Sequence, residues 1–400
     1  MKRLYLILVV IFFSHLAAGQ SSNGKGQSLF DKGEEAYRKG SYKTALAHYN
    51  ECLRVDPYFM EAYHSRAMTR EKLGDAKGAL TDFNIYLESK PQNAEALFTR
   101  ALLRYQNGQW AMAREDFLKI LKAPPSETST VFYSSGKENG GTITTMNSQG
   151  IEPAMLNYLA MVDTKLKNYK RSVKYLDSAI VLNSKEAEYF INRAYAQQML
   201  GDTAKAINDY QKSLELNPDG AIARHNLAVL LARKGDLKET ENLLTEAIEK
   251  NPKLPYSYSE RAFNRTQQKN FKGALEDYDQ AIQLDPKDID NWMNRALVKE
   301  KLKDNHGALA DYAQAIKIRS DYEKVWLNRG NLMYRMNRLK ESIEDYTVAI
   351  TYYADYGNAY YNRAIAYQKS GNLAEACKDL QKAQSLGIVV EKKVSQAICK

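Results

Sequence analysis

Hydrophobic residues recur at a spacing of four along most of the chain, in pairs of stretches separated by a short polar turn. In residues 60–93, the first stretch carries Tyr63 and Ala67, and the second carries Ala79 and Phe83. A Leu-Gly-Asp segment, Leu73–Asp75, lies between them. This spacing is typical of amphipathic helices, and glycine commonly ends a helix. The pattern therefore predicts two helices joined by a tight turn.

This helical pair recurs with a fixed period of 34 residues. A fixed period of this size indicates stacked supersecondary units, and 34 is the value for a helix–turn–helix unit. The windows begin at Gly26, Met60, Ala94, Pro153, Ala187, Ala221, Pro255, Ile289, Glu323 and Gly357. Only the step from Ala94 to Pro153 is longer, by 25 residues. We number the windows as repeats 1 to 10.

Four places of the window carry recurring residue types. In repeat 8 they are Trp292 at the fourth place, Ala296 at the eighth, Ala308 at the twentieth and Tyr312 at the twenty-fourth. This combination resembles the tetratricopeptide repeat family over about residues 26–388. The resemblance implies an all-α, right-handed superhelical solenoid of about ten helix–turn–helix repeats. Repeats 1–3 span 26–125 and repeats 4–10 span 153–388.

Repeats 4 and 6 depart from this pattern. Ser172 and Thr240 replace the alanine of the second helix, and Leu176 and Leu244 replace its aromatic residue. The same two repeats, together with repeat 1, also depart at the seventh and twenty-third places of the window.

Seven windows carry arginine at the seventh place and aspartate sixteen residues later. The two occur together or not at all within one window, which predicts an ion pair across each helical hairpin. The pairs are Arg66 and Asp82, Arg100 and Asp116, Arg193 and Asp209, Arg261 and Asp277, Arg295 and Asp311, Arg329 and Asp345, and Arg363 and Asp379. Repeats 1, 4 and 6 have Lys32 and His48, Leu159 and Tyr175, and Leu227 and Leu243. We therefore expect these arginines to be structural rather than to bind phosphate or nucleic acid.

The chain ends differ from the repeats. Residues 1–19 combine a short basic start, a ten-residue apolar run and small residues, a pattern typical of a cleavable secretory signal peptide. Residues 20–25 form a short linker, and residues 389–400 predict a C-terminal capping helix. No later segment is apolar enough to span a membrane. We expect an exported protein, periplasmic or secreted, in a Gram-negative envelope.

The 126–152 segment interrupts the helical pattern. Two β-prone runs, 130–133 and 142–146, flank a Gly-rich stretch, so the segment is either a β-hairpin or an irregular loop. It separates a three-repeat block from a seven-repeat block and is a candidate hinge.

The chain has three cysteines. Cys52 occupies a place where other repeats have a buried alanine, which predicts a free thiol in the core. Cys377 and Cys399 lie near the end of the chain, where an exported protein can hold a disulfide. The alternative is two packed thiols.

Catalytic, metal-binding and nucleotide-binding motifs are absent from the sequence, so we expect no enzyme, no cofactor and no metal. Of the histidines in the repeats, His225 is the one of interest on the inner face, and a surface role is expected for it. The formal net charge is +9, but the signs alternate along the helices, which argues against a nucleic-acid surface.

The resemblance places the first helix of each repeat along a concave groove. There the sixth place holds asparagine in five repeats: Asn192, Asn226, Asn294, Asn328 and Asn362. This resembles the asparagine ladder of O-GlcNAc transferase, which holds an extended peptide by its backbone. A side-chain amide both donates and accepts hydrogen bonds. Tyr195, Phe263 and Tyr361 would add apolar contacts. The alternative is that asparagine only suits a hydrated helix surface.

We therefore expect a non-enzymatic scaffold or adaptor that binds a protein or an extended peptide. The alternative is a structural spacer in a secretion, gliding or polysaccharide-export assembly. The carboxylate clamp that other members use for chaperone tails needs Lys, Arg and Asn on consecutive repeats, and this set is missing. The oligomeric state and the partner are not specified by the sequence.

Overall fold

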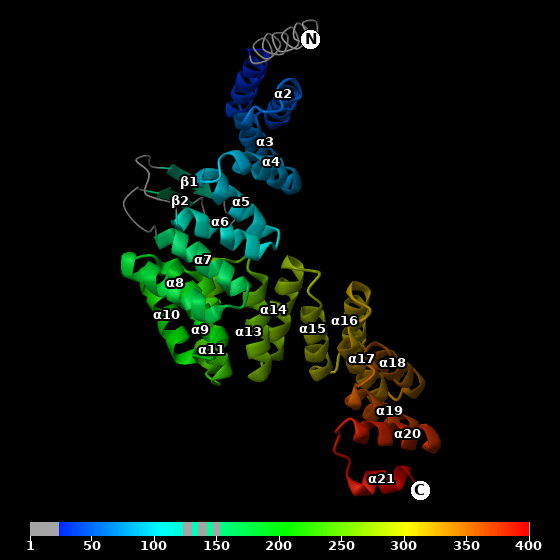
Figure 1. Cartoon of the computed structure of the whole chain (residues 1–400). Helices are drawn as coiled ribbons and strands as arrows, with labels where there is room; N and C mark the ends of the chain where they lie inside the picture. The colour runs from blue at the N-terminus through cyan, green and yellow to red at the C-terminus, as the bar shows by residue number, and fades with distance from the viewer. Residues whose placement is uncertain (1–23, 123–129, 135–141, 147–152, 400) are drawn as a thin grey trace, which may run out of the picture. The chain divides into compact units, whose positions relative to one another are not determined.

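The computed structural model describes residues 24–122, 130–134, 142–146 and 153–399, with the two short middle segments described by their backbone alone. Consecutive helices pack in pairs as a tetratricopeptide-type solenoid (Figure 1). The predicted signal peptide and most of the linker lie outside the described residues.

The helices follow the predicted windows closely. Helical residues 24–38 open repeat 1. The labelled helices of the first part are α2 (Tyr42–Val55), α3 (Met60–Lys72), α4 (Ala76–Ser89), α5 (Ala94–Gln106), α6 (Trp110–Lys122), α7 (Pro153–Lys165), α8 (Tyr169–Leu182), α9 (Ala187–Met199) and α10 (Thr203–Leu216). Those of the second part are α11 (Ala221–Arg233), α12 (Leu237–Lys250), α13 (Pro255–Gln267), α14 (Phe271–Leu284), α15 (Ile289–Lys301), α16 (Asn305–Ile318), α17 (Glu323–Arg335), α18 (Leu339–Tyr352), α19 (Gly357–Lys369), α20 (Leu373–Ser385) and α21 (Lys392–Ile398).

A left-handed residue at the fifteenth place turns the chain between the two helices of every repeat. Gly74, with φ of +80°, is typical of the six repeats that carry glycine there. The other four repeats use a lysine or asparagine with φ of 60–63°: Lys167, Lys269, Lys303 and Asn337. Glycine adopts this conformation without a steric penalty. The backbone requirement is thus the same in all ten repeats, although the sequence shows it in only six.

Small residues at the eighth place let the two helices of a repeat approach closely. Gly330 on α17 illustrates this, since a Cβ atom there would lie 2.8 Å from the ring of Tyr346 on α18. Gly33 fills the same place in repeat 1 and alanine fills it in the other eight repeats, where Ala67 and Ala296 are fully buried. The aromatic residue of the second helix, such as Tyr312, fills the space beside it and is also fully buried. These contacts form the core of each hairpin.

The insertion contains a β-hairpin. Strands β1 (Thr130–Ser134) and β2 (Thr142–Met146) are antiparallel, with Phe132 opposite Thr144. Strand β1 lies near α5 (Figure 1).

The hinge expected at the insertion stays a prediction, although the helical core continues past it. The rings of Phe117 on α6 and Tyr158 on α7 stack at 5.4 Å. Arg114 Nε on α6 also lies 3.0 Å from Asp163 Oδ1 on α7. Repeats 3 and 4 are therefore packed as neighbours.

By its internal contacts the chain divides into two compact units, residues 1–212 and 213–400, and the boundary falls within α10. We call them unit 1 and unit 2 and describe each by itself. Within the described residues, no helix is both long and apolar enough to cross a membrane.

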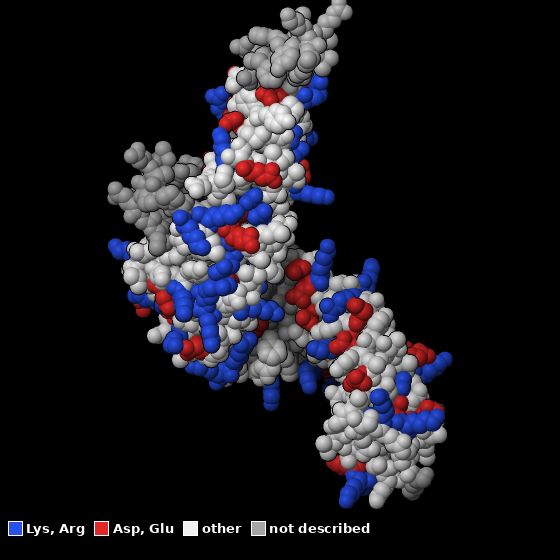
Figure 2. All heavy atoms as spheres, viewed as in Figure 1, with Lys and Arg blue, Asp and Glu red and all other residues white. Residues whose placement is uncertain are grey.

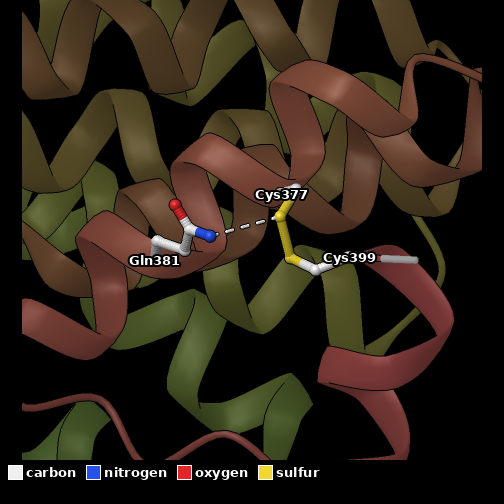
Figure 3. The surroundings of a disulfide bond; sticks show 3 residues. All are labelled: Cys377, Gln381 and Cys399. Atoms are coloured by element: carbon white, nitrogen blue, oxygen red, sulfur yellow. Dashed lines mark hydrogen bonds between the residues drawn. A yellow bond between two sulfur atoms is a disulfide. The ribbon is translucent and has the colours of Figure 1, made fainter.

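The C-terminal cap is held covalently. Cys377 on α20 and Cys399 after α21 form a disulfide, beside which Gln381 Nε2 donates to Cys377 Sγ at 3.5 Å (Figure 3). Ile398 of α21 packs into the last hydrophobic cluster. The capping helix is shorter than the predicted 389–400 segment. Cys52 is a free, buried thiol, and burial raises its pKa to about 11.

Candidate functional site: the first-helix face

Each seventh-place arginine contacts the aspartate sixteen residues later through two parallel hydrogen bonds. In all seven repeats Nε and Nη2 donate to the two carboxylate oxygens at 2.6–2.9 Å. This bidentate geometry is the strongest form of an arginine–carboxylate pair. The aspartates are buried, from Asp82 to Asp379. The arginines therefore belong to the scaffold in this structure.

The same arginines make two further contacts that sequence reasoning missed. In six of the seven repeats the guanidinium lies over the ring of the fourth-place aromatic residue, as with Arg295 over Trp292 at 4.9 Å. In six repeats Nη1 also donates to a side chain sixteen residues upstream, on the second helix of the preceding repeat. Those acceptors are Asn50, Asn84, Asp177, Thr245, Asp279 and Thr347. The recurrence of polar residues at the twenty-fifth place is the sequence signal for this link.

Arg329 is the exception among the arginines. The residue sixteen places upstream is Ala313, which offers no side-chain acceptor. Within the described residues, Arg329 and Asp345 have only each other as charged hydrogen-bond partners. This pair is therefore the simplest of the seven.

The five asparagines lie on first helices, and all are half-buried. First helices of neighbouring repeats contact one another. In unit 1, α7 contacts α9, and in unit 2, α11 contacts α13 and α13 contacts α15. Among the residues that the structure describes, Asn226, Asn294 and Asn328 make no side-chain hydrogen bond. Their amide groups are therefore available to a ligand.

Two of the asparagines are already engaged. Asn192 Nδ2 donates to Asn157 Oδ1 at 2.8 Å, and Asn362 Nδ2 donates to Asn331 Oδ1 at 2.8 Å. Asn331 also accepts from Tyr346 Oη at 2.9 Å. These contacts tie both amides to neighbouring helices. Of the five predicted asparagines, two are therefore hydrogen-bonded within the protein, and three have amide groups without a side-chain hydrogen bond in the described residues.

Three large apolar side chains at the ninth place of the first helices are exposed. Tyr195 in unit 1 is 42% exposed, and Phe263 and Leu297 in unit 2 are 49% and 37% exposed. Tyr361 differs, since it packs against the cluster that contains Ile398 and the capping helix. Of the predicted aromatic contacts, Tyr195 and Phe263 are thus accessible and Tyr361 is largely structural.

The expectation of a surface role for His225 is wrong. Its side chain is buried, and its ring lies 4.6 Å from that of Tyr256. Burial lowers the pKa of His225 to about 4. Ser257 Oγ lies 3.3 Å from His225 Nδ1, a contact between a hydroxyl and a neutral imidazole. The ring is therefore uncharged at neutral pH.

Glu260 occupies the sixth place of repeat 7, where the ladder has its one exception. Burial raises the pKa of this carboxyl, although the charge of Arg233 acts in the opposite direction. The acidic side chain is therefore less readily ionised than a free glutamate, and it follows Asn226 and precedes Asn294 along unit 2.

Charges of both signs lie side by side over the face drawn in Figure 2. In the described ranges, no group of three or more His, Cys, Asp or Glu side chains is placed to hold a metal ion. The first helices offer a ligand the half-buried amides and the exposed apolar side chains described above.

Sequence models described as tetratricopeptide repeat match residues 26–59, 64–128, 187–219, 209–241, 289–322 and 357–386, together more than half of the chain. A tetratricopeptide-repeat-containing protein of Methanocaldococcus jannaschii is 28% identical over 92 residues, which are 23% of this chain and 16% of the relative. The chain thus matches only a small part of that protein's length.

Solved structures of the same fold class are similar at low identity. A tetratricopeptide repeat protein of Parabacteroides merdae is 16% identical, with 63% of this chain and all of that one covered and a TM-score of 0.48. Yeast Tom70 is 17% identical, with 94% and 95% covered and a TM-score of 0.35. YrrB, described as having an unusual peptide-binding site, is 20% identical, with 44% and 92% covered and a TM-score of 0.38.

Proposed function

Because the chain belongs to the tetratricopeptide repeat family, whose members generally mediate contacts between proteins, we propose that it is a non-enzymatic scaffold that binds an extended peptide segment of a partner. The observation that carries the proposal is the row of open amides on the first helices of unit 2. Asn226, Asn294 and Asn328 have no internal partner in the described part of the chain, and exposed Phe263 and Leu297 lie on the same set of helices.

The chemistry suits a peptide backbone. A half-buried amide without a protein partner is left to bind water, and a peptide N–H or C=O group can take the place of that water in its hydrogen bonds. Backbone recognition needs no particular side chains, so it tolerates varied sequences. The exposed aromatic and aliphatic side chains between the amides would then favour apolar residues of the bound segment.

The proposed setting is outside the cytoplasm. It rests on residues 1–19, whose basic start, apolar run and small residues have the pattern of a secretory signal peptide. The disulfide between Cys377 and Cys399 supports the same setting, because such bonds persist in oxidising compartments.

A structural spacer is the second candidate. Each of six arginines connects three consecutive helices by side-chain hydrogen bonds: the second helix of the preceding repeat and both helices of its own repeat. These links favour a stiff stack of helices within each unit. A spacer would not require the open amides of unit 2, so the two candidates differ in what mutation of those amides does.

The test is quantitative capture of a partner from envelope extract, followed by its identification and measurement of its dissociation constant. The triple variant Asn226→Ala, Asn294→Ala and Asn328→Ala is compared with Asn242→Ala, which changes an exposed asparagine on the second helix α12. We expect the triple variant to weaken binding about tenfold or more at unchanged Tm, given the energy of two or three hydrogen bonds. Retention of the partner by the triple variant would exclude backbone recognition by these amides.

A further inference from the structure

A hollow of about 280 Å³ lies in unit 1, between repeats 1 and 3. It is lined by Glu34, Tyr37, Tyr49, His64, Ser65, Met68 and Glu95. These residues come from the opening helix, α2, α3 and α5. The volume is small for a drug-sized ligand and suits a single long side chain. We call it the acidic pocket.

Two carboxylates in the pocket lack a cationic partner. Among the residues that the structure describes, neither the Glu34 carboxylate nor the Glu95 carboxylate forms an ion pair, and Arg38 Nε donates only to the backbone carbonyl of Glu34, whereas nearby Glu61 is paired with Lys90 at 2.6 Å. Both carboxylates are half-buried. Such charges are ordinarily paired when they leave water. Two unpaired acids in one hollow are unusual in a chain of formal net charge +9.

The pocket is framed by uncharged neighbours, one of which holds Glu34 in place. Tyr49 Oη donates to Glu34 Oε1 at 2.7 Å, which orients that carboxylate. The ring of His64 packs 4.8 Å from the ring of Tyr86 and 5.9 Å from that of Phe83. The pocket is therefore built on packed side chains rather than on a loop.

His64 supplies an unused polar atom to this site. Its Nε2 is buried and has no hydrogen-bond partner among the described residues. Burial lowers the pKa of His64, an effect partly offset by the charges of Glu95 and Glu34, so the ring is neutral at pH 7. In the tautomer protonated at Nδ1, the free Nε2 accepts a hydrogen bond. A buried orphan acceptor indicates a missing donor.

We propose that the acidic pocket binds an arginine or lysine side chain of the partner protein. A cation with several N–H donors satisfies Glu34, Glu95 and His64 Nε2 together, and arginine, with five donors, fits this set best. The aliphatic stem lies against Met68 and the ring of Tyr37. This inference rests on the proposed function in one respect only, that the cation belongs to a bound peptide.

The test uses the full chain with histidine labelled by ¹³C at Cε1, which gives few signals because the chain has five histidines. The probes are the peptide acetyl-Gly-Gly-Arg-Gly-Gly-amide, the same peptide with uncharged citrulline, and spermidine. The His64 signal is assigned as the one that the His64→Gln variant lacks. We expect the arginine peptide to shift this signal until binding saturates, while the signal of exposed His306 stays constant. The dissociation constant of the citrulline peptide should be higher by about tenfold or more, because this peptide lacks the charge-assisted hydrogen bonds.

Matched variants separate a specific site from general attraction. Glu34→Gln with Glu95→Gln should abolish the shift, and the exposed Glu276→Gln should leave it unchanged. Glu95→Gln alone serves if the double variant does not fold. Equal binding of the citrulline peptide, or retained binding by the charge-neutral variants, overturns the proposal. Binding of spermidine without the arginine peptide also overturns it, since the ligand is then a free amine. The readout is the signal of His64 in unit 1, whereas partner capture is tested with the asparagines of unit 2, so failure of one test is distinguishable from failure of the other.

Discussion

Repeats 6 and 9 fill the same place in the helical hairpin in opposite ways. Repeat 9 places Arg329 and Asp345 across α17 and α18, with bonds of 2.8 and 2.7 Å. Repeat 6 places Leu227 and Leu243 at the corresponding positions of α11 and α12, and both are buried. The two hairpins have helices of the same length and the same turn. In these two repeats the hairpin interface therefore holds a matched pair, charged in repeat 9 and apolar in repeat 6.

Repeat 4 is a third solution in which the charges exchange helices. Asp163 lies on the first helix α7 and is fully buried. Its cations come from second helices, Arg171 on α8 at 2.6 Å and Arg114 on α6 of the preceding repeat at 3.0 Å. Leu159, at the seventh place, packs into the core instead. In both repeat 4 and repeat 9 the buried carboxylate is paired with at least one arginine, as expected for a charge removed from water.

The largest effect should follow from breaking the pair of repeat 9. Arg329→Leu leaves Asp345 buried without a cation, and we expect a loss of about 3–5 kcal/mol in unfolding free energy, measured by urea denaturation. Burial already raises the pKa of Asp345. The variant should therefore lose less at acid pH, where the carboxyl is protonated. Arg319→Leu, at an exposed arginine, is the control, and equal effects of the two variants would refute a special role for the pair.

The stability of repeat 6 should depend on pH because of His225, and not because of its apolar pair of leucines. His225 has its folded pKa lowered to about 4 by burial, below the ordinary 6.5. The unfolded chain therefore takes up a proton first as the pH falls, so stability is lost between about pH 6.5 and 4 and is constant for this group outside that window. We expect His225→Gln to remove this pH-dependent loss of stability, which is on the order of 3 kcal/mol. His306→Gln should not, and an identical slope in both variants would contradict the assignment.

Repeat 4 should respond more weakly to the loss of one of its two cations. Arg171→Ala leaves Asp163 paired with Arg114, and the lost bonds involve a side chain that is 44% exposed. We expect a loss of about 1 kcal/mol, discounted for solvent screening. Thermal denaturation of the two variants should show a larger loss of Tm for Arg114→Ala, because the Arg114 side chain is the more buried of the two. The opposite order would mean that Arg171 carries the carboxylate.

The smallest effect should come from converting repeat 9 into the solution of repeat 6. The double variant Arg329→Leu with Asp345→Leu removes both charges at once, and we expect stability within about 1 kcal/mol of the native chain, because replacing a buried ion pair by packed apolar residues is often neutral. A double-mutant cycle with the two single variants measures the coupling. If the double variant loses as much as the sum of the singles, the matched-pair account fails.

Much of the scaffold could be predicted from the sequence because it repeats. The window boundaries and the co-occurrence of arginine and aspartate are visible when ten copies are aligned by period alone. The link from Arg295 to Asp279 was missed, because its acceptor changes among Asn, Asp and Thr from repeat to repeat. Likewise, Lys303 adopts the turn conformation of Gly74 without its residue type.

The candidate site was predicted less completely than the fold. Periodicity placed five asparagines on first helices, but it could not distinguish Asn294 from Asn362, since the partner of Asn362 is Asn331, a residue that occurs at the ninth place in this one repeat. The burial of His225 depends on the neighbouring Tyr256 of the next repeat. Both outcomes arise from contacts between particular neighbours, which an average repeat does not contain.

The central claim is a division of roles, in which seventh-place charges hold the hairpins and sixth-place amides bind the partner. The most direct measurement is the dissociation constant of the captured partner for two folded variants side by side. The account predicts that Asn226→Ala with Asn294→Ala and Asn328→Ala weakens binding about tenfold or more, while Arg329→Leu with Asp345→Leu leaves it unchanged. Unchanged binding in the asparagine variant together with weakened binding in the pair variant would contradict it.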